Sequence, residues 1–286
     1  MKTLNNKILR KPEWLKVQLT STSDYSFLKK KLSKDSLHTI CESGNCPNQA
    51  ECWAQLTATF LILGNVCTRN CKFCNVTKGK PIKPDKEEPK KIANLIQQLK
   101  LKHTVITSVT RDDLPDGGAS HWAMVIKEIK YNCPTVTIEA LIPDFQLSET
   151  SLNIIVEAAP NIVSHNLETV ERLTPLIRSY ANYKRSLKVL KFLSQKKIKT
   201  KSGIMVGLGE TDEEVYKTMD DILEVGCKIL TIGQYLQPSL KHFPVDRYVH
   251  PSIFDEYREV ALKKGFIFVE STPLARSSYH SSKHIL

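Results

Sequence analysis

Short apolar segments alternate with helix-like segments between residues 58 and 236, and this alternation limits the possible folds more than any other feature of the chain. The apolar segments have strand character; they are residues 58–63, 104–109, 136–142, 162–165, 203–207 and 229–235. The helix-like segments, several with apolar residues three or four positions apart, are residues 91–100, 122–131, 148–159, 183–196 and 212–225. Strands that are almost continuously apolar suit a parallel sheet covered on both faces, and a repeat of about 30 residues is typical of a βαβ unit.

Six such units are fewer than the eight of a complete α/β barrel, so the pattern is compatible with a partial barrel or an open doubly wound sheet. No G-x-G-x-x-G follows the first strand, which weighs against a dinucleotide-binding fold. Either architecture places function at the carboxyl ends of the strands. We therefore predict an N-terminal extension (residues 1–57), a strand-helix body (residues 58–236) and a C-terminal segment (residues 237–286), with both extensions capping that end.

The composition is that of a soluble globular protein, with 41% hydrophobic and 25% charged residues, and no apolar run approaches the roughly 20 residues of a membrane-spanning helix. The N-terminus lacks the apolar core of a secretory signal, so we expect a cytoplasmic protein with no membrane partner. The alternative is a mitochondrial transit peptide, because the first twelve residues hold no acid, although they contain one arginine and no serine. The net charge of +11 indicates an acidic partner. The lysines are spread through segments typical of solvated surfaces, so we do not expect that partner to be nucleic acid.

Six of the eight cysteines fall between residues 41 and 74, which is unlike accidental packing. Cytosolic thiols are kept reduced, so metal or cluster binding is favoured over a disulfide framework. Cys67, Cys71 and Cys74 follow the first predicted strand in GNVCTRNCKFCNV, with C-x3-C-x2-C spacing. A four-iron cubane normally takes four cysteines, so a three-cysteine loop leaves one iron open to a substrate. The alternative, zinc, would want a fourth protein ligand and usually other spacings.

A second group, Cys41, Cys46 and Cys52 in CESGNCPNQAECW, has C-x4-C-x5-C spacing and matches no common zinc pattern. On its own it indicates only a second metal or cluster site. The C-x3-C-x2-C loop resembles the signature of the radical S-adenosylmethionine (SAM) superfamily, and the two groups together resemble lipoyl synthase. Further stretches of that family cover nearly the whole chain: CPNQAECW, TATFLILG, ITSVTRDDLPDGGA, LIPDF, SHNLETV, TKSGIMVGLGET, LTIGQYLQPS and RSSYH.

The resemblance implies a partial (β/α)6 barrel of the TIM type that carries two 4Fe-4S clusters. Cys67, Cys71 and Cys74 would hold the catalytic cluster, whose open iron is chelated by SAM. Cleavage of SAM there yields a 5′-deoxyadenosyl radical, and the protein contributes placement and exclusion of water.

The resemblance also implies that Cys41, Cys46 and Cys52 hold an auxiliary cluster. The fourth iron of that cluster would be bound by a serine of the RSSY motif. Position in that motif favours Ser278 as both iron ligand and catalytic residue, with Ser277 as the alternative. A serine alkoxide is a harder ligand than thiolate and easier to lose, which suits a cluster that is destroyed to supply sulfur. Without the resemblance, a polar turn or cap is the favoured interpretation. The chain departs from the family pattern at Thr272 and Ser281, neither of which is a proposed ligand.

Strand-end loops hold SAM in the radical SAM superfamily, and location together with resemblance suggests which residues contact it here. They are Gly117, Gly118, Glu139, Asn166, Glu168, Gly207, Glu210 and Gln234. Glycines at these places would let the backbone approach the ligand. The GLGET segment also fits a strand-to-helix turn in which Thr211 caps a helix that starts at Asp212, and both interpretations can hold at once.

The resemblance further implies lipoate biosynthesis by a sulfurtransferase. Two SAM molecules per turnover give two radicals that abstract hydrogens from C6 and C8 of an octanoyl chain on a lipoyl-domain lysine, and the auxiliary cluster gives up two sulfides. The expected protein substrates are octanoylated lipoyl domains, namely the acyltransferase subunit of 2-oxo-acid dehydrogenases and the glycine-cleavage H protein. A reductase, flavodoxin or ferredoxin would donate electrons. The alternatives are a radical SAM methylase or mutase, which would not need the second cysteine group, and a zinc-bearing basic module that binds nucleic acid.

Other chemistry-bearing residues have simpler interpretations. The charged trio at residues 111–113 lies just past a predicted strand, where a functional role and a loop salt bridge are both open. We expect the rest to be structural: Cys133 and Cys227 as core thiols, and His103, His121 and His165 as hydrogen-bonded histidines.

Overall fold

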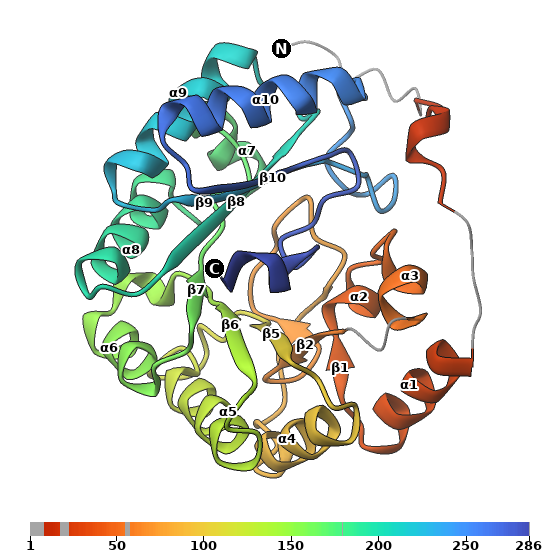
Figure 1. Ribbon diagram of the computed structural model, residues 1–286, viewed down its shortest axis with the longest axis vertical. Coiled ribbons are helices and arrows are strands. Elements are labelled where there is room, and N and C mark those ends of the chain that lie inside the picture. The colour runs from red at the N-terminus through yellow and green to blue at the C-terminus, as the bar shows by residue number, and fades with distance from the viewer. Residues whose placement is uncertain (1–8, 18–22, 55–57, 179, 286) are drawn as a thin grey trace.

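The computed structural model describes residues 9–17, 23–54, 58–178 and 180–285 (Figure 1). Its strands are β1 (His38–Thr39), β2 (Thr59–Ile62), β3 (Val66–Cys67), β4 (Thr77–Lys78), β5 (His103–Ser108), β6 (Thr137–Leu141), β7 (Ile162–Ser164), β8 (Thr200–Val206), β9 (Ile229–Gln234) and β10 (Phe268–Ser271). The α-helices are α1 (Ser23–Lys34), α2 (Ile40–Ser43), α3 (Gln49–Ala54), α4 (Glu88–Gln98), α5 (Ala119–Asn132), α6 (Glu149–Ala158), α7 (Thr174–Ile177), α8 (Tyr183–Gln195), α9 (Asp212–Glu224) and α10 (Pro251–Lys264). The short 3-10 helices are η1 (Glu13–Leu15), η2 (Phe145–Leu147), η3 (Glu171–Leu173) and η4 (Ser281–Ile285).

Eight strands form one sheet in the order β1-β2-β5-β6-β7-β8-β9-β10, parallel throughout except that β1 runs antiparallel to β2. The sheet curves around an interior, with helices on its outer side, and in the described part of the chain it stays open between β1 and β10 (Figure 1). The mid-strand residue Val105 of β5 pairs with Thr59 of β2 and with Glu139 of β6. The fold is therefore of the partial TIM-barrel type, as predicted.

All six predicted strands are present, but the sheet continues beyond residue 236, where the predicted strand-helix body ends. After residue 236 we expected only a cap, whereas the structure adds α10 and then β10, which pairs in parallel with β9. The physical reason is an apolar stripe on α10, where Phe254, Tyr257 and Ala261 are buried. This stripe packs the helix against the body and returns the chain as a further strand.

The two extensions were predicted to cover the carboxyl ends of the strands, and only part of them does so. Residues near Phe243 do reach the carboxyl-end side, since the Phe243 amide donates to the carbonyl of Lys72 in the first cysteine loop (2.9 Å). The cysteines from 41 to 52 instead lie beside Thr59, the first residue of β2. Because β1 runs antiparallel to β2, the chain that leaves β1 emerges at the amino end of β2. The expectation that both extensions cap the carboxyl ends was therefore wrong for this part.

Side-chain caps explain where helices α6, α8 and α9 begin. Thr211 accepts from the Glu214 amide while the Glu214 carboxylate accepts from the Thr211 amide, which is a capping box and confirms the predicted start of α9. Ser148 caps α6 and Asn182 caps α8 in the same way through their side-chain oxygens. These caps fix the strand-to-helix turns at the carboxyl ends of the strands.

The hydrophobic core lies between the sheet and the outer helices in two clusters. One surrounds β2, β5 and β6 and includes Trp53, Phe60 and Trp122, all fully buried. The other surrounds β8 and β9 and includes Ile232, Met219 and Tyr257. Within the described residues, no helix is long and apolar enough to cross a membrane.

Candidate active site

The first cysteine loop follows β2 and is pinned to the carboxyl ends of neighbouring strands. The short pair β3 and β4 closes its base. The Thr68 amide donates to the carbonyl of Thr110 beyond β5 (3.1 Å), and the Lys72 amide donates to the carbonyl of Ile177 in α7 (2.8 Å). Cys67, Cys71 and Cys74 therefore lie on one rigid loop, where sequence analysis placed them.

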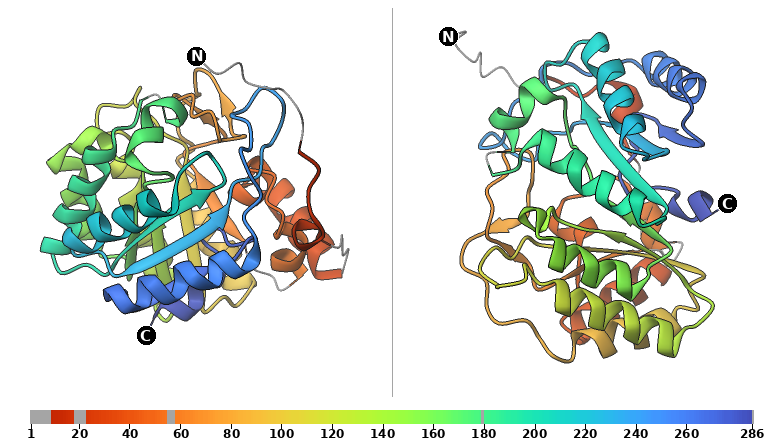
Figure 2. Two further views of the ribbon diagram at one scale, coloured as in Figure 1. Left: turned by 90° about the horizontal axis from the view of Figure 1, so that it is seen from above. Right: turned by 90° about the vertical axis from the view of Figure 1, so that its left-hand side faces the viewer.

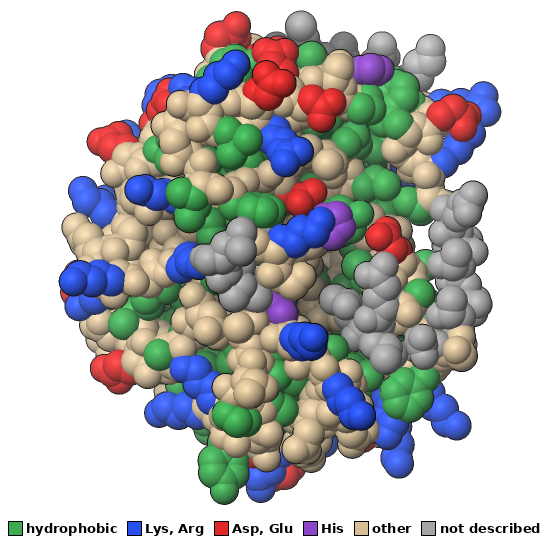
Figure 3. Space-filling view, in the orientation of Figure 1, with side chains coloured by type: hydrophobic (Ala, Val, Ile, Leu, Met, Phe, Trp, Pro, Cys, Tyr) green, Lys and Arg blue, Asp and Glu red, His purple; other side chains and the backbone are tan. Residues whose placement is uncertain are grey.

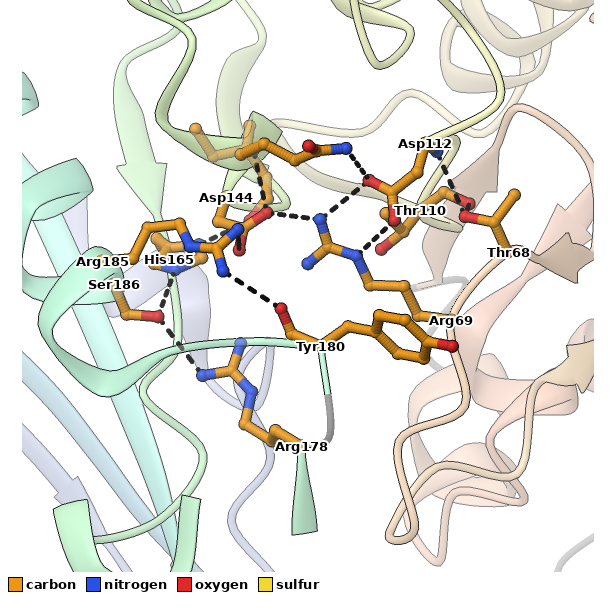
Figure 4. A network of polar contacts seen from close by, with 12 residues as sticks. Thr68, Arg69, Thr110, Asp112, Asp144, His165, Arg178, Tyr180, Arg185 and Ser186 are labelled. Atoms are coloured by element: carbon orange, nitrogen blue, oxygen red, sulfur yellow. Dashed lines mark hydrogen bonds and ion pairs between the residues drawn. The ribbon is translucent and has the colours of Figure 1, made fainter. Parts of the chain in front are cut away.

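Arg69, which lies between the first two cysteines of this loop, is the centre of a buried polar network (Figure 4). Its guanidinium donates to both carboxylate oxygens of Asp112 (2.6 and 2.8 Å) and to Oδ1 of Asp144 (2.7 Å). Burial alone would raise the pKa of Asp144, but the hydrogen bond and charge of Arg69 outweigh it and hold that pKa below its usual range. Asp112 thus ties the loop to β5, while Asp144 ties it to β6.

The thiols of the loop lie close to one another, to the buried Arg178 and to the partly buried Glu168. Burial raises the pKa of Cys74 to about 12, and neighbouring thiols and Glu168 add to the effect. Burial also raises the pKa of Cys71, against the lowering effect of the Arg178 guanidinium. In Glu168, burial raises the carboxyl pKa while Arg178 opposes the shift. The site therefore holds both signs of charge beside the cysteines.

Two buried polar atoms here have no hydrogen-bond partner among the described residues. They are Nε of Arg178 and Oδ1 of Asn166. Neighbouring nitrogens of the same side chains are hydrogen-bonded: Nη1 of Arg178 donates to the carbonyls of Asn166 (3.2 Å) and Leu167 (2.9 Å), and Nδ2 of Asn166 donates to Glu168 (3.1 Å). Buried polar groups are nearly always paired, so a free donor and a free acceptor fit a polar ligand at this end of the barrel.

The second cysteine group lines a pocket together with the C-terminal segment. Its lining includes Cys41, Cys46 and Cys52 from the N-terminal extension, Ser278 from the RSSY segment, and residues at the amino ends of β2 and β5. The complete lining is Cys41, Cys46, Asn48, Cys52, Ala58, Thr59, His103, Val105, Arg276, Ser278, Tyr279 and Ser281. Sequence positions more than two hundred residues apart therefore meet at one site.

The thiols of this pocket influence one another. Burial raises the pKa of Cys41 to about 11, and Cys46 adds to the rise. Burial likewise raises the pKa of Cys52 to about 12, with further contributions from the other two thiols. No group of three or more His, Cys, Asp or Glu side chains in the described ranges is arranged to hold a single metal ion. The donor set, three thiols and a hydroxyl around one pocket, fits a cluster that spans the space between them.

The two adjacent serines of the RSSY segment have different surroundings. Ser278 lines the cysteine pocket. Ser277 instead faces the barrel interior, where its hydroxyl accepts a hydrogen bond from Nδ2 of Asn166 (2.6 Å) and its carbonyl accepts from Nζ of Lys201. Of the two serines, only Ser278 lines the pocket with the three cysteines.

The two cysteine groups lie at opposite ends of the barrel interior. The side view in Figure 2 shows the β3–β4 loop on one side and the C-terminal segment on the other. Between them the strands direct polar side chains inward: Lys201 donates to Glu139 (2.9 Å), both fully buried, and Ser164 donates to the same carboxylate (2.6 Å). Buried polar side chains therefore lie in the barrel interior between the two cysteine groups.

The predicted SAM contacts divide into three sets. Asn166 and Glu168 lie by the first cysteine loop, whereas Glu139 lies deeper, paired with Lys201. Gly117 and Gly118, both at positive φ, form the turn into α5, where a Cβ on Gly118 would come within 2.5 Å of Leu63. The others form the turns that tie β8 and β9 to the segment near Arg247: Gly207, Glu210 and Gln234.

Gly207 packs directly against the side chain of Gln234, which explains why position 207 needs glycine. Gly207 has φ of 93°, and a Cβ there would lie 2.2 Å from the Gln234 amide nitrogen and 2.5 Å from the Arg247 carbonyl oxygen. Gln234 donates to the carbonyl of Arg247 (3.0 Å) and accepts from the Val249 amide (2.8 Å). Glu210 accepts from the amides of Gly207 and Leu208, and burial raises its pKa.

Sequence reasoning missed several residues that build the site. Arg69 was visible as a charge inside the cysteine loop, and that signal could have marked a buried ionic role. Lys201 lies in a lysine-rich stretch before the predicted strand 203–207, so nothing in the sequence set it apart. In the charged trio, the salt-bridge interpretation holds for Arg111 with Asp113 (2.8 Å), but Asp112 pairs with the cysteine loop. The three histidines are hydrogen-bonded as expected, although His103 also lines the second pocket.

Comparison with known proteins fits this geometry. The model of the radical SAM superfamily matches residues 61–222, so the fold and the three-cysteine loop define a radical SAM protein. Lipoyl synthase from Bacteroides fragilis is 55% identical over 281 residues, covering 98% of each chain, and that from Treponema denticola is 54% identical over 277 residues, covering 97% of this chain and 96% of the relative. The chain belongs to the lipoyl synthase family and is an enzyme, a sulfurtransferase.

Solved structures with low sequence identity share the fold. HydG, a maturase of the [FeFe]-hydrogenase, superposes with a TM-score of 0.61 at 16% identity, covering 92% of this chain and 68% of its own. Methylornithine synthase superposes with a TM-score of 0.56 at 15% identity, covering 91% and 85%. These likenesses support the partial barrel and nothing beyond it.

Proposed function

We propose that this chain inserts two sulfur atoms, at C6 and C8, into an octanoyl chain carried on a lysine of a lipoyl domain. The observation that carries the proposal is the placement of two three-thiol groups at opposite ends of one barrel interior, with Ser278 lining the second pocket. An acyl chain lying between the two ends would be within reach of a radical from one and of sulfur from the other.

Cys67, Cys71 and Cys74 would hold one 4Fe-4S cluster, and the second cysteine group with Ser278 would hold the other. When bound, the first cluster supplies the electron that cleaves SAM to a radical, two SAM per turnover, and the auxiliary cluster supplies the sulfur. The protein's part is positioning. Arg69 holds the first loop against the segments that follow β5 and β6. The protein would also exclude water from the reacting carbon atoms.

Among the predicted SAM contacts, we place most weight on Asn166 and Glu168. Arg178 joins them, because its buried Nε lacks a partner among the described residues and would suit the SAM carboxylate. The Glu168 carboxylate and the Asn166 oxygen would accept from the SAM amino group. We retain the remaining predicted contacts as part of the proposal: Gly117, Gly118, Glu139, Gly207, Glu210 and Gln234.

The proposed partners are proteins that carry an octanoylated lipoyl domain, such as the acyltransferase subunit of a 2-oxo-acid dehydrogenase or the glycine-cleavage H protein, in the cytoplasm. Such domains tend to be acidic, and the net charge of +11 would speed their encounter with this chain. On the face seen in Figure 3, Lys and Arg side chains are distributed over several elements rather than gathered in one patch. A flavodoxin or ferredoxin would donate the electrons.

The decisive experiment is an anaerobic single turnover of the reconstituted protein with SAM, a reductant and an octanoyl-lysine peptide, followed by mass spectrometry. We expect the wild type to add two sulfurs. The Cys46→Ala variant should form 5′-deoxyadenosine without any sulfur transfer, because it keeps the first cysteine loop and loses a ligand of the second pocket. A wild type that cleaves SAM and never adds sulfur would leave radical chemistry standing and refute sulfur insertion.

A further inference from the structure

The RSSY segment is anchored to the barrel on both sides of Ser278. Before it, the Gln234 amide donates to the carbonyl of Pro273 (3.1 Å), and Asn48 donates to the carbonyl of Leu274 (2.8 Å). After it, the Ser281 hydroxyl lies 3.0 Å from Nε2 of His103, the first residue of β5. These contacts guide the segment into the open side of the barrel, toward the amino ends of the strands.

The anchor nearest to Ser278 comes from inside the barrel. Nζ of Lys201, on β8, donates to the carbonyl of Ser277 and to the carboxylate of Glu139 on β6 (2.9 Å). The side chains of Lys201 and Glu139 are fully buried. A third contact, from Asn166 to the Ser277 hydroxyl (2.6 Å), comes from the loop after β7. Two side chains therefore hold the residue that precedes Ser278: Lys201, which is itself held by Glu139, and Asn166.

A buried ion pair contributes little net stability on its own, since the desolvation of both charges offsets their attraction. Apolar side chains of similar volume would fill the same space without that cost. The Lys201 ammonium has one further use that such residues could not supply, which is a strong charge-assisted hydrogen bond to a backbone carbonyl in the RSSY segment. The residue that follows this carbonyl is Ser278, which lines the cysteine pocket.

We propose that Lys201 is a positioning residue for the auxiliary cluster: from the barrel interior it holds the Ser277 carbonyl and so presents the Ser278 hydroxyl to the three cysteines. The inference rests on the proposed function, because it takes Ser278 as the fourth ligand of that cluster. Lys201 touches neither the cysteines nor Ser278 in this scheme and acts through the backbone alone.

The test compares wild type with Lys201→Met and with the double variant Lys201→Met/Glu139→Gln, in the full chain reconstituted with iron and sulfide. The double variant avoids an unpaired buried carboxylate, so it keeps the test valid if the single variant folds poorly. Tyr183→Phe serves as the matched control, because it removes a half-buried hydrogen bond to Asp221 (2.8 Å) outside the barrel interior.

Two measurements are made on each protein. Hydrogen exchange of the peptide covering residues 272–281 should be about tenfold faster in both Lys201 variants, since the loss of a charge-assisted hydrogen bond has an effect of that order. Mössbauer spectroscopy should show part of the auxiliary cluster as a three-iron form, because its serine-bound iron is lost. The control should match wild type in both measurements, which separates positioning from general destabilisation.

The inference is overturned if the folded Lys201 variants keep wild-type exchange in residues 272–281 and a complete four-iron auxiliary cluster. A different outcome would count against the proposed function itself. If wild-type protein binds only the cluster of Cys67, Cys71 and Cys74, then there is no second cluster to position, and sulfur insertion by that route fails whatever the variants do.

Discussion

Ser277 and Ser278 are neighbours in sequence with different surroundings, and substitution tests their proposed roles separately. Ser278→Ala removes the hydroxyl that lines the cysteine pocket, so we expect loss of sulfur insertion with retention of 5′-deoxyadenosine formation. Ser277→Ala removes only the hydroxyl bonded to Asn166 and leaves its carbonyl on Lys201, so most sulfur insertion should remain. Product analysis by mass spectrometry checks both. Equal loss in the two variants would contradict the assignment of Ser278.

The ion pairs of Arg69 should make the stability of the fold depend on pH. The pKa values of Asp112 and Asp144 lie below their usual range because Arg69 outweighs the opposing effect of burial, so their ionised forms stabilise the fold. That contribution is present above the pKa of an unfolded aspartate and is lost as the pH falls through the lower pKa of the folded state. We expect Arg69→Met to cost about 3 kcal/mol at neutral pH, the order found for breaking a buried pair.

Chemical denaturation at neutral pH and near pH 4 measures this difference between wild type and Arg69→Met. The difference in free energy of unfolding between the two proteins should be smaller at the lower pH. Protonation neutralises the carboxylates that the variant leaves unpaired. Lys217→Met, which breaks an exposed pair with Asp221, should change the free energy of unfolding by less than about 1 kcal/mol. If this difference in free energy of unfolding does not change with pH, then Arg69 stabilises the fold through packing and not through its charge.

At the scale of elements, the capping box of α9 fixes the turn that follows β8. Thr211→Ala removes the side-chain acceptor of the Glu214 amide and should cost about 1 kcal/mol of stability. Urea denaturation followed by circular dichroism measures the cost. Thr211→Ser, which keeps the acceptor, is the control and should lie close to wild type. An alanine variant as stable as wild type would mean that packing alone defines the start of the helix.

Element by element, the sequence predicts strands well where apolar residues run continuously and less well where a strand is short. The six central strands were predictable because each is buried on both faces. The two edge strands were missed: β1 has two residues, and β10 has four, with only alternate ones buried. Edge strands face a neighbour on one side only, so their sequences carry a weaker apolar signal.

For the whole molecule, the spacing of cysteines predicted two groups of three ligands, but their placement depends on topology. The antiparallel direction of β1 sends Cys41 and its neighbours to the amino end of the barrel, and nothing in the spacing carries that information. Lys201 was equally hidden, since its partners lie 62 residues away at Glu139 and 76 residues away at Ser277. Contacts between distant segments were the part that sequence reasoning could not supply.

The central claim for the whole molecule is that the sulfur in the product comes from the pocket of Cys41, Cys46, Cys52 and Ser278. The most direct test reconstitutes the protein with sulfide enriched in a heavy sulfur isotope, removes the excess, and runs a single anaerobic turnover in buffer with ordinary sulfide. We predict that both sulfurs in the octanoyl-lysine product carry the heavy isotope. A product that contains only ordinary sulfur would show that the sulfur comes from solution and would contradict the account.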